Sequence, residues 1–554
     1  MNKTLLSIAL AAVCQGALAQ QPPTGGALQV PPAPAAPRAA PGVRIEPAPA
    51  AAPTAGGAAQ ARITVRALRI TGMQIYTEAE LLAASGFTPG DRLSLGDLQS
   101  LAAAITAHYR RNGYFVAQAF LPVQDVRDET VTIAVSEGRL GRVELRNQAG
   151  LSDSVALGSL QGLQPGNPIA LEPFESRLLL LSDVPGVVVR STLVPGTTPG
   201  TSDLVVELAP GERITGSIDA DNAGNRYTGA YRLGATVNVN NPLGLGDVAS
   251  LRLLTSGDGL RYARGSYQLQ VGRGQVGVAY SRLDYRLGRE FEPLGAHGTA
   301  DIASVYGRYP LVRSRNRNLY LQLAFDAKRF EDVVDSVPAT SRRNSRVLMT
   351  SLYGDSRDEL GGGGLSSYFL TWSAGQVDIE TPAVRAQDAL TARTGGSFHK
   401  LSFSAIRLQR LGGPFSLHVG LTGQVASKNL DVSEKMELGG MNAVRAYPEG
   451  EAYADQGYLL TVEARMDLPR LWAAQPGHLQ LVAFADTGTV RLNREPWLPG
   501  DNSRTLSGAG IGASWAEPGN FAIRTFYARK LGNAPATSAP DRSGRFWVQL
   551  VKFF

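Results

Sequence analysis

Residues 546–554 read FWVQLVKFF, and this stretch, which ends the chain at Phe554, decides the fold class. One face of it is apolar except where Lys552 interrupts, and its other members are Phe546, Val548, Leu550 and Phe554. A strand that ends on an aromatic residue is typical of a transmembrane β-barrel. Strands can cross a membrane only as a closed barrel, because an open sheet would leave backbone polar groups unpaired in lipid. A lysine near the membrane edge can reach the interface, so Lys552 is compatible with this interpretation.

An export signal is predicted over residues 1–19. Lys3 supplies the positive charge, residues 5–13 form a short apolar run, and residues 17–19 read ALA, a small-x-small cleavage site that makes Gln20 the expected mature start. No later stretch reaches the roughly 18 apolar residues that a spanning helix needs. Cys14 is the only cysteine and lies inside the signal, so disulfides, thiolate metal sites and cysteine nucleophiles are excluded from the expected mature chain.

Residues 20–60 consist almost entirely of Pro, Ala and Gly. Such a segment cannot bury enough apolar surface to offset its ordering entropy, so we expect an extended, mobile linker. The whole chain has 554 residues and 62 glycines, which is too long for one compact domain. Its net charge of +6 is mild, and the arginines are not gathered in one stripe, so nucleic acid is not an expected partner.

Residues 61–138 predict a small α/β module with the order β-α-α-β-β. A strand is expected over residues 63–70, and two capping boxes, Thr77 with Glu80 and Ser94 with Asp97, mark two helix starts. The second helix should end near residue 112, at an Asn-Gly pair. Two further strands are then expected over residues 114–121 and 130–135.

The same order of elements recurs in residues 139–210, which predicts a second module of the same kind. The expected elements are a strand at 143–145, helices at 152–160 and 173–181, and strands at 187–189 and 204–208.

Residues 211–554 alternate between apolar and polar side chains, as a barrel wall between lipid and water requires. The clearest case has one apolar face and one polar face, made respectively of Leu417, Val419, Leu421 and Val425, and of Ser416, His418, Thr422 and Gln424. A soluble β-sandwich would alternate too. The export signal, the length and Phe554 favour the barrel.

Several motifs in the first module resemble the first polypeptide-transport-associated (POTRA) domain of two-partner secretion transporters. They are YRRNGY at 109–114, Pro122 with Gln124, and VSEG at 135–138. The start of the barrel region is also similar to these transporters, in DNAG at 221–224, TG at 228–229 and NPLGLGD at 241–247. The resemblance implies two POTRA domains, 61–138 and 139–210, followed by a sixteen-stranded barrel over 211–554. Five motif residues are expected to be structural rather than direct contacts: Tyr109, Gly113, Tyr114, Pro122 and Gln124.

No catalytic constellation is present in the sequence. There is no nucleophile-elbow serine, no Walker loop and no paired spacing among the five histidines. We therefore predict no enzyme activity, no catalytic or metal-ligating residue, and no cofactor.

Two further motifs resemble the signatures of the outer-membrane assembly and secretion superfamily: VRAY at 444–447 and FADTG at 484–488. The resemblance implies that a long extracellular loop folds back into the lumen, where Arg445 pairs with Asp486 on the wall. Val444, Tyr447, Phe484 and Gly488 complete the two motifs. From the residues alone, two unrelated lumen charges remain the alternative. Loss of one partner would cost on the order of 3–5 kcal/mol in a desolvated pair and about 0–1 kcal/mol in a wet lumen.

The sequence departs from the pattern of these families at two places. The loop motif has Ala446 where the superfamily has glycine, which would cost roughly 1–2 kcal/mol if the position needs a left-handed backbone. Some relatives have an amphipathic N-terminal helix that plugs the barrel, but residues 20–60 show no helical periodicity. A plug helix is therefore not predicted.

The resemblance implies an outer-membrane pore of a Gram-negative bacterium that exports a large β-rich exoprotein, such as an adhesin, a haemolysin, an iron-acquisition protein or a contact-dependent toxin. Its POTRA domains would lie in the periplasm and bind the N-terminal secretion domain of that exoprotein. Outer-membrane lipid and the barrel assembly machinery are further expected partners. One alternative is a factor that inserts other barrels, although such factors typically carry three or more modules. The other is a diffusion porin, which needs no modules.

Overall fold

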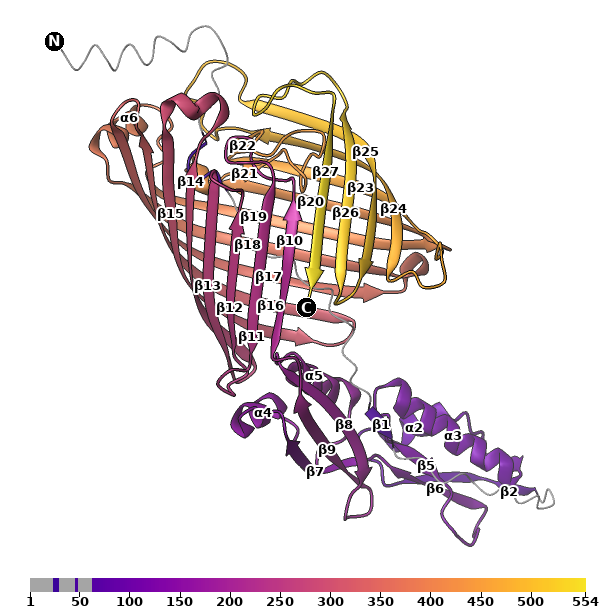
Figure 1. Ribbon diagram of the computed structural model, residues 1–554. Coiled ribbons are helices and arrows are strands. Elements are labelled where there is room, and N and C mark those ends of the chain that lie inside the picture. Colours follow the sequence, from indigo (N-terminus) through magenta and orange to yellow (C-terminus); the bar gives the residue numbers. More distant parts are fainter. Residues whose placement is uncertain (1–22, 29–44, 48–61) are drawn as a thin grey trace, which may run out of the picture.

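The computed structural model describes residues 23–28, 45–47 and 62–554, arranged as two small α/β units attached to one end of a large barrel (Figure 1). The predicted signal, with Cys14 and Gln20, and most of the predicted linker lie outside these residues. Within the described residues, no helix is both long and apolar enough to cross a membrane.

The first unit has the predicted elements and both predicted capping boxes, but the first strand is split into two and a further short strand lies between the helices. In α2 and α3, the hydroxyls of Thr77 and Ser94 accept from the backbone N–H of Glu80 and Asp97, and those carboxylates accept in return. Its elements are β2 Ile63–Val65, β3 Ala67–Thr71, α2 Glu78–Ser85, β4 Asp91–Leu93, α3 Leu95–Arg111, β5 Gln118–Phe120 and β6 Thr130–Ser136. The strand expected over 114–121 is shorter, because a turn in which the N–H of Ala117 donates to the carbonyl of Tyr114 precedes β5.

The second unit repeats this architecture around a sheet with the order β1-β8-β9-β7. Its elements are β7 Arg139–Asn147, α4 Asp153–Leu160, α5 Leu171–Ser182, β8 Val187–Pro195 and β9 Thr201–Pro210. The edge strand β1, Ile45–Pro47, comes from the predicted linker and pairs in parallel with Ser191 to Leu193 of β8. At this point the segment differs from the mobile tether that its composition predicts.

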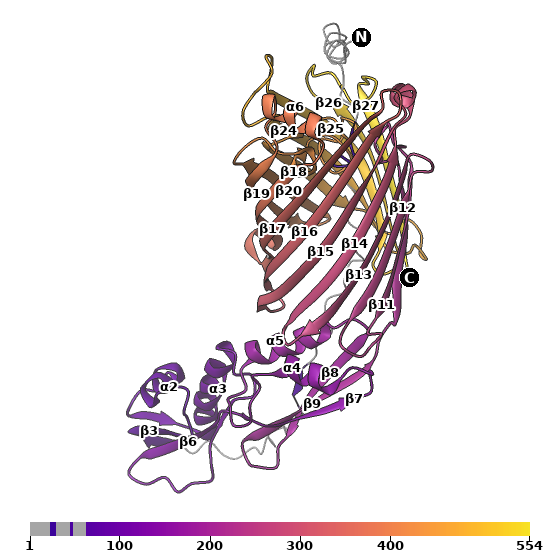
Figure 2. The same ribbon diagram turned by 90° about the vertical axis from the view of Figure 1, so that its left-hand side faces the viewer.

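Sixteen antiparallel strands close into a barrel, which confirms the expected strand number. Figure 2 shows the strands tilted against the barrel axis, with the two α/β units at one end. The strands are β10 Ile214–Asp221, β11 Arg232–Asn240, β12 Val248–Thr255, β13 Leu260–Val271, β14 Gly274–Arg286, β15 Ala296–Arg313, β16 Arg317–Val334, β17 Ala339–Asp358, β18 Gly364–Ile379, β19 Gly396–Gly412, β20 Phe415–Ala426, β23 Gln456–Asp467, β24 His478–Arg491, β25 Ser503–Glu517, β26 Phe521–Lys530 and β27 Gly544–Phe553.

The predicted alternation is present in β20, where Leu421 and Val425 are exposed on the outside while Gln424 is buried inside. Residues 546–553 of the C-terminal stretch lie in β27. This strand closes the barrel against β10, from Ser217 opposite Phe553 to Asp221 opposite Gln549. The backbones of Phe554 and Gly216 exchange two further hydrogen bonds. Lys552 lies on the outer face near the end that carries the α/β units, as expected for a lysine at a membrane edge.

The second unit is attached to the barrel by charged and backbone contacts. The guanidinium of Arg313, at the end of β15, donates to both carboxylate oxygens of Asp183 at 2.7 and 2.9 Å. The N–H of Ser152 donates to the carbonyl of Gly244, in the β11–β12 turn, at 2.7 Å. The unit is therefore fixed to two separate turns of the barrel.

Candidate functional site in the barrel lumen

Residues 427–455, which connect β20 to β23, fold back into the barrel, and we call them the lumen loop. The loop contains a 3-10 turn, Val432–Glu434, and a two-stranded ribbon of β21, Met436–Glu437, and β22, Tyr453–Ala454. Figure 1 shows this ribbon inside the barrel outline. Its apolar side chains pack against the walls of β24, β26 and β27.

Arg445 of the lumen loop forms a two-point ion pair with Asp486 of β24. Its Nε donates to Oδ2 at 2.8 Å and one terminal nitrogen donates to Oδ1 at 2.7 Å, while the Arg445 backbone N–H also donates to Oδ2, at 3.2 Å. The other terminal nitrogen donates to Oε1 of Glu463, on β23, at 2.7 Å. The planar guanidinium thus has carboxylates on two adjacent strands, which fixes its orientation as well as its charge.

Aromatic side chains complete the surroundings of Arg445. Its guanidinium carbon lies 3.5 Å from the ring centre of Phe484 and 4.9 Å from that of Phe526, which are cation–π distances. The indole N–H of Trp547, in the C-terminal strand, donates to the Arg445 carbonyl at 2.7 Å. Arg445 is therefore held through its charge, its flat face and its backbone.

The burial of this pair decides which of the two expected magnitudes applies. Arg445 is 4% exposed and Asp486 is 1% exposed, so neither charge is in open water. Removing Arg445 would leave Asp486 as a buried, unpaired charge, which costs on the order of 3–5 kcal/mol. Removing Asp486 would leave Arg445 with Glu463 alone. The pair therefore holds the loop in place more firmly than an exposed ion pair could.

The other residues of the two motifs pack around the pair. Val444 and Tyr447 are fully buried, and the Tyr447 hydroxyl donates to the carbonyl of Ala534, in the β26–β27 loop, at 3.0 Å. Gly488 lies against Leu438 of the loop, whose Cδ1 would be 2.4 Å from any Cβ at position 488. A side chain at Gly488 would therefore push the loop from the wall.

Ala446 does not carry the backbone cost that its departure from glycine suggested. It is absent from the non-glycine residues with positive φ in the described chain. Its methyl carbon lies 2.4 Å from the position that a Cβ on Gly508, in β25, would occupy. The wall thus has glycine where the loop has alanine, and the extra methyl group fits there.

Among the motif residues of the first α/β unit, Tyr109 lies in the core, and Gly113, Tyr114, Pro122 and Gln124 are partly buried. Tyr109 is fully buried, and its hydroxyl donates at 2.9 Å to Glu137, which also accepts from the backbone N–H groups of Gln74 and Ile75. Burial and the hydrogen bond to Glu137 raise the pKa of Tyr109, so the hydroxyl stays a donor. Tyr109 and Tyr114 meet edge to face.

The remaining motif residues also have roles in the architecture of this unit. Gly113 ends α3 with a φ of 90°, a conformation that favours glycine. The side-chain amide of Gln124, two residues after Pro122, exchanges two hydrogen bonds with the backbone of Thr132, at 2.7 and 2.8 Å. These contacts belong to the framework of the unit for Tyr109, Gly113, Tyr114 and Gln124. That all five residues are structural rather than direct contacts for a partner stays a prediction.

Comparison with known proteins identifies the family. Residues 200–515, more than half of the chain, match the family described as haemolysin secretion/activation protein ShlB/FhaC/HecB, and residues 63–138 match the ShlB-type POTRA domain. The chain belongs to this family of transporters. Its barrel therefore lies in the outer membrane and its POTRA domain, the first α/β unit, lies in the periplasm. That the second unit is also a POTRA domain stays a prediction.

Individual relatives agree with this assignment. The chain is 29% identical over 472 residues to the heme/hemopexin transporter protein HuxB of Haemophilus influenzae, covering 84% of this chain and 82% of that protein. Among solved structures, CdiB from Escherichia coli matches with a TM-score of 0.69 and 22% identity, covering 92% of this chain and 94% of CdiB. BamA from Haemophilus ducreyi matches less well, with a TM-score of 0.54 and 15% identity, covering 89% of this chain and all of that BamA chain. These structural likenesses concern the fold.

Sequence reasoning about this transporter missed Glu463, the second carboxylate on Arg445. Glu463 lies directly opposite Phe484 in the β23–β24 register, so both point into the lumen. It also accepts two hydrogen bonds from Arg465, at 2.8 and 2.6 Å. The sequence places Glu463 at a polar position of an alternating strand, which was the available signal. The register that sets it opposite Phe484 could not be read from the sequence.

The lumen loop has a second ionic anchor on a different part of the wall. Glu434 accepts from Lys328 of β16 at 2.6 Å and from Lys400 of β19 at 2.9 Å. Asp431 accepts from Arg343 of β17 at 2.6 Å. The loop is thus tied to both sides of the lumen, with acids at one end and Arg445 at the other.

An N-terminal segment of the transporter lies beside this second anchor. The N–H of Gly25 donates to Oδ1 of Asp332 on β16, at 3.0 Å, and the hydroxyl of Tyr453 in the loop donates to the carbonyl of Ala27, at 3.0 Å. Residues 23–28 form a turn rather than a helix. This part of the predicted linker therefore contacts both the barrel wall and the lumen loop.

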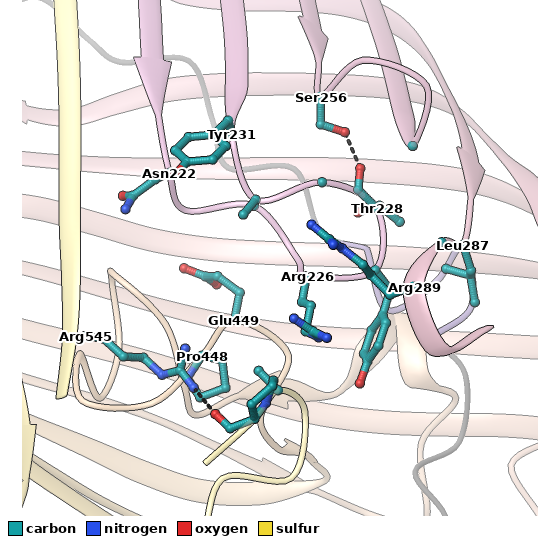
Figure 3. A pocket seen from close by; sticks show the side chains of 18 of the residues that line it. Asn222, Arg226, Thr228, Tyr231, Ser256, Leu287, Arg289, Pro448, Glu449 and Arg545 are labelled. Carbon is teal, nitrogen blue, oxygen red and sulfur yellow. Dashed lines mark hydrogen bonds between the residues drawn. The ribbon is translucent and has the colours of Figure 1, made fainter. Parts of the chain in front are cut away.

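A cavity of about 900 Å³ lies at the extracellular end, beside the tip of the lumen loop (Figure 3). The β10–β11 loop contributes Asn222, Arg226 and Tyr231, the lumen loop contributes Glu449, and β27 contributes Arg545. Its lining is polar and charged on several sides. The loop tip therefore has unfilled space next to it.

Proposed function

We propose that this transporter exports one cognate, large β-rich exoprotein through its barrel, and that the lumen loop must leave the position seen here for the exoprotein to pass. The observation that carries the proposal is the arrangement of the loop, which crosses a closed barrel and is tied to both sides of its wall. A loop held this way obstructs an extended polypeptide. The cavity beside the loop tip supports the proposal by providing space for a displacement.

The inner wall of the barrel is polar. The periplasm supplies no nucleotide that could drive export. The energy for export would come from folding of the exoprotein outside the cell, which withdraws unfolded chain from the pore. No residue of the transporter needs to perform covalent chemistry in this scheme.

The periplasmic POTRA domains would bind the N-terminal secretion domain of the exoprotein as an added strand. Strand addition uses backbone hydrogen bonds and tolerates many sequences. The pairing of Ile45–Pro47 with β8 supports this step, because it is an example of an extended segment that joins this sheet edge. An incoming strand at the same edge would have to replace that segment.

The experiment that tests the function is deletion of the encoding gene, followed by measurement of both secreted proteins and outer-membrane proteins. We expect one large exoprotein to disappear from the medium and the cell surface, while other barrels keep their levels. Complementation with the intact gene should restore that exoprotein. A broad loss of outer-membrane barrels would instead indicate an assembly factor, and no change in either pool would indicate a passive pore.

A further inference from the structure

The outer wall of β14 to β17 changes abruptly from apolar to basic along the strands. On these strands one set of alternating residues faces the lumen, as shown by Leu283, Ala300 and Phe330, which are buried against Leu28 inside the barrel. The opposite set faces outward. In register across the four strands, one outward row consists entirely of exposed apolar side chains: Val278, Val305, Phe325 and Leu348.

The next two outward rows toward the extracellular end have a different chemistry. The first row is Tyr280, Ala303, Ala327 and Arg346, and the second is Arg282, Asp301, Arg329 and Asn344. Because two alanines stand between larger neighbours, the wall is hollowed there, and the hollow has a volume of about 510 Å³. It lies directly above the last apolar row, which is where a barrel meets the headgroups of the membrane.

The charges around this hollow are unequally balanced. Asp301 accepts from the hydroxyl of Tyr280 at 2.6 Å and from Arg282 at 3.4 Å, and Arg282 also contacts Asp284 at 3.2 Å. By contrast, Arg329 and Arg346 are exposed and have no side-chain hydrogen bond or ion pair within the described part of the chain. Two guanidinium groups therefore flank the hollow without an ion pair to any described residue. Asp301 lies opposite Arg329 in the register but is engaged by Tyr280 and Arg282.

Other acidic side chains nearby do not neutralise these two arginines. Glu331, one row further out, is paired with Arg342 at 3.0 Å. Asp378 of β18 lies opposite Asn344, and no ion pair joins it to either arginine in the described residues. A phosphate group suits two neighbouring guanidinium forks, because it has enough oxygens to accept hydrogen bonds from both of them.

We propose that Arg329 and Arg346 bind the phosphate of a lipid of the outer leaflet, with the lipid chains lying along the apolar row below. The alanines leave room for the headgroup, and Tyr280 lies at the interface, where an aromatic ring with a polar end is favoured. This site is on the outside of the barrel and is separate from the export path.

The test is retention of phosphorylated lipid A by the purified full-length transporter, measured by native mass spectrometry after exchange into a neutral detergent. The variant is Arg329→Gln with Arg346→Gln. We expect its retention of lipid A to fall by about tenfold or more, since charge-assisted hydrogen bonds of both forks are lost. Lipid A stripped of its phosphates should bind both proteins equally weakly.

The matched control is Arg317→Gln with Arg357→Gln, which removes two exposed arginines from the same strands, β16 and β17, at their periplasmic ends. This variant should retain lipid A like the unchanged protein. Equal retention by the Arg329/Arg346 variant, or an equal loss in the control, would overturn the site. Displacement of lipid A by millimolar inorganic phosphate would also contradict it, because the site would then bind free anions rather than a lipid.

Discussion

The two ends of the lumen loop are attached to the barrel with opposite polarity. At one end the loop supplies the cation, Arg445, and the wall supplies the acids, Asp486 and Glu463. At the other end the loop supplies two acids, Glu434 and Asp431. The wall there supplies two lysines to Glu434 and Arg343 to Asp431. The Arg445 end also has aromatic rings against a flat guanidinium, whereas a lysine is a compact charge with little directional demand.

The Arg445 contact therefore depends on geometry, whereas the contact of Glu434 with its two lysines depends on charge. A fork held by two carboxylate oxygens and a ring face tolerates no change of shape. Two lysines around one carboxylate tolerate small shifts but need the negative charge. Substitutions that alter only shape or only charge should therefore separate the two anchors.

The largest effect is expected from Asp486→Arg, which places a like charge against Arg445 in a buried site. Loss of the pair costs on the order of 3–5 kcal/mol, and the added cation increases the penalty, so the loop should leave the wall. We expect secretion of the exoprotein to be impaired and the channel current in planar lipid films to rise.

The reversed pair, Asp486→Arg with Arg445→Asp, is the control for this prediction. It restores opposite charges and should recover part of the secretion. Wild-type secretion by the single Asp486→Arg variant would refute a role for the pair.

The next effect is expected from Glu434→Gln, which keeps the shape of the side chain and removes its charge. Lys328 and Lys400 would then face each other in a buried site without their shared carboxylate, at a cost of about 3 kcal/mol. We expect the lumen loop to become more sensitive to added protease, with a smaller rise in channel current than for Asp486→Arg. A Glu434→Asp variant keeps the charge and should behave nearly like the unchanged protein, and equal protease sensitivity of both variants would contradict a charge-dependent anchor.

A smaller effect is expected from Arg445→Lys. In contrast to Glu434→Gln, this change keeps the charge and removes the planar guanidinium. The loss of one charge-assisted hydrogen bond and of the flat contact with Phe484 should cost about 2 kcal/mol. Secretion should be reduced but measurable. Normal secretion and normal channel current in this variant would mean that the Arg445 end, like the other, needs only charge.

The smallest effect is expected from Gly508→Ala, which adds a methyl group where the Ala446 methyl already lies. Overpacking of this size costs about 1 kcal/mol, visible as a modest drop in the temperature at which the barrel unfolds in detergent. Adding Ala446→Gly transfers the methyl group from the loop to the wall and should restore that temperature. No recovery in the double variant would show that the two positions do not share this space.

Much of the fold could be predicted from the sequence because its signals are local. The capping boxes at Thr77 and Ser94 and the alternation around Leu421 depend only on neighbouring residues. The family resemblance supplied the expectation that Arg445 meets Asp486, which lie 41 residues apart. The two motifs alone do not show that residues so far apart in the chain meet in the folded protein.

The contacts that could not be predicted are those set by the register between strands and by segments that are far apart in the sequence. Glu463 joins Arg445 only because it lies opposite Phe484, and Glu434 meets two lysines from strands that are not adjacent in sequence. The strand formed by Ile45–Pro47 was unpredictable for another reason, since its partner β8 is about 145 residues away and its own composition has little strand propensity.

The closure of the barrel by β10 and β27 has a consequence for the order of events in biogenesis. The joint depends on the final stretch of the chain, and Phe554 itself bonds to the backbone of Gly216. Until β27 reaches β10, the edge of the first strand has no permanent neighbour and the ring stays open. In that interval the unpaired backbone edge of β10 is open to pairing with another chain.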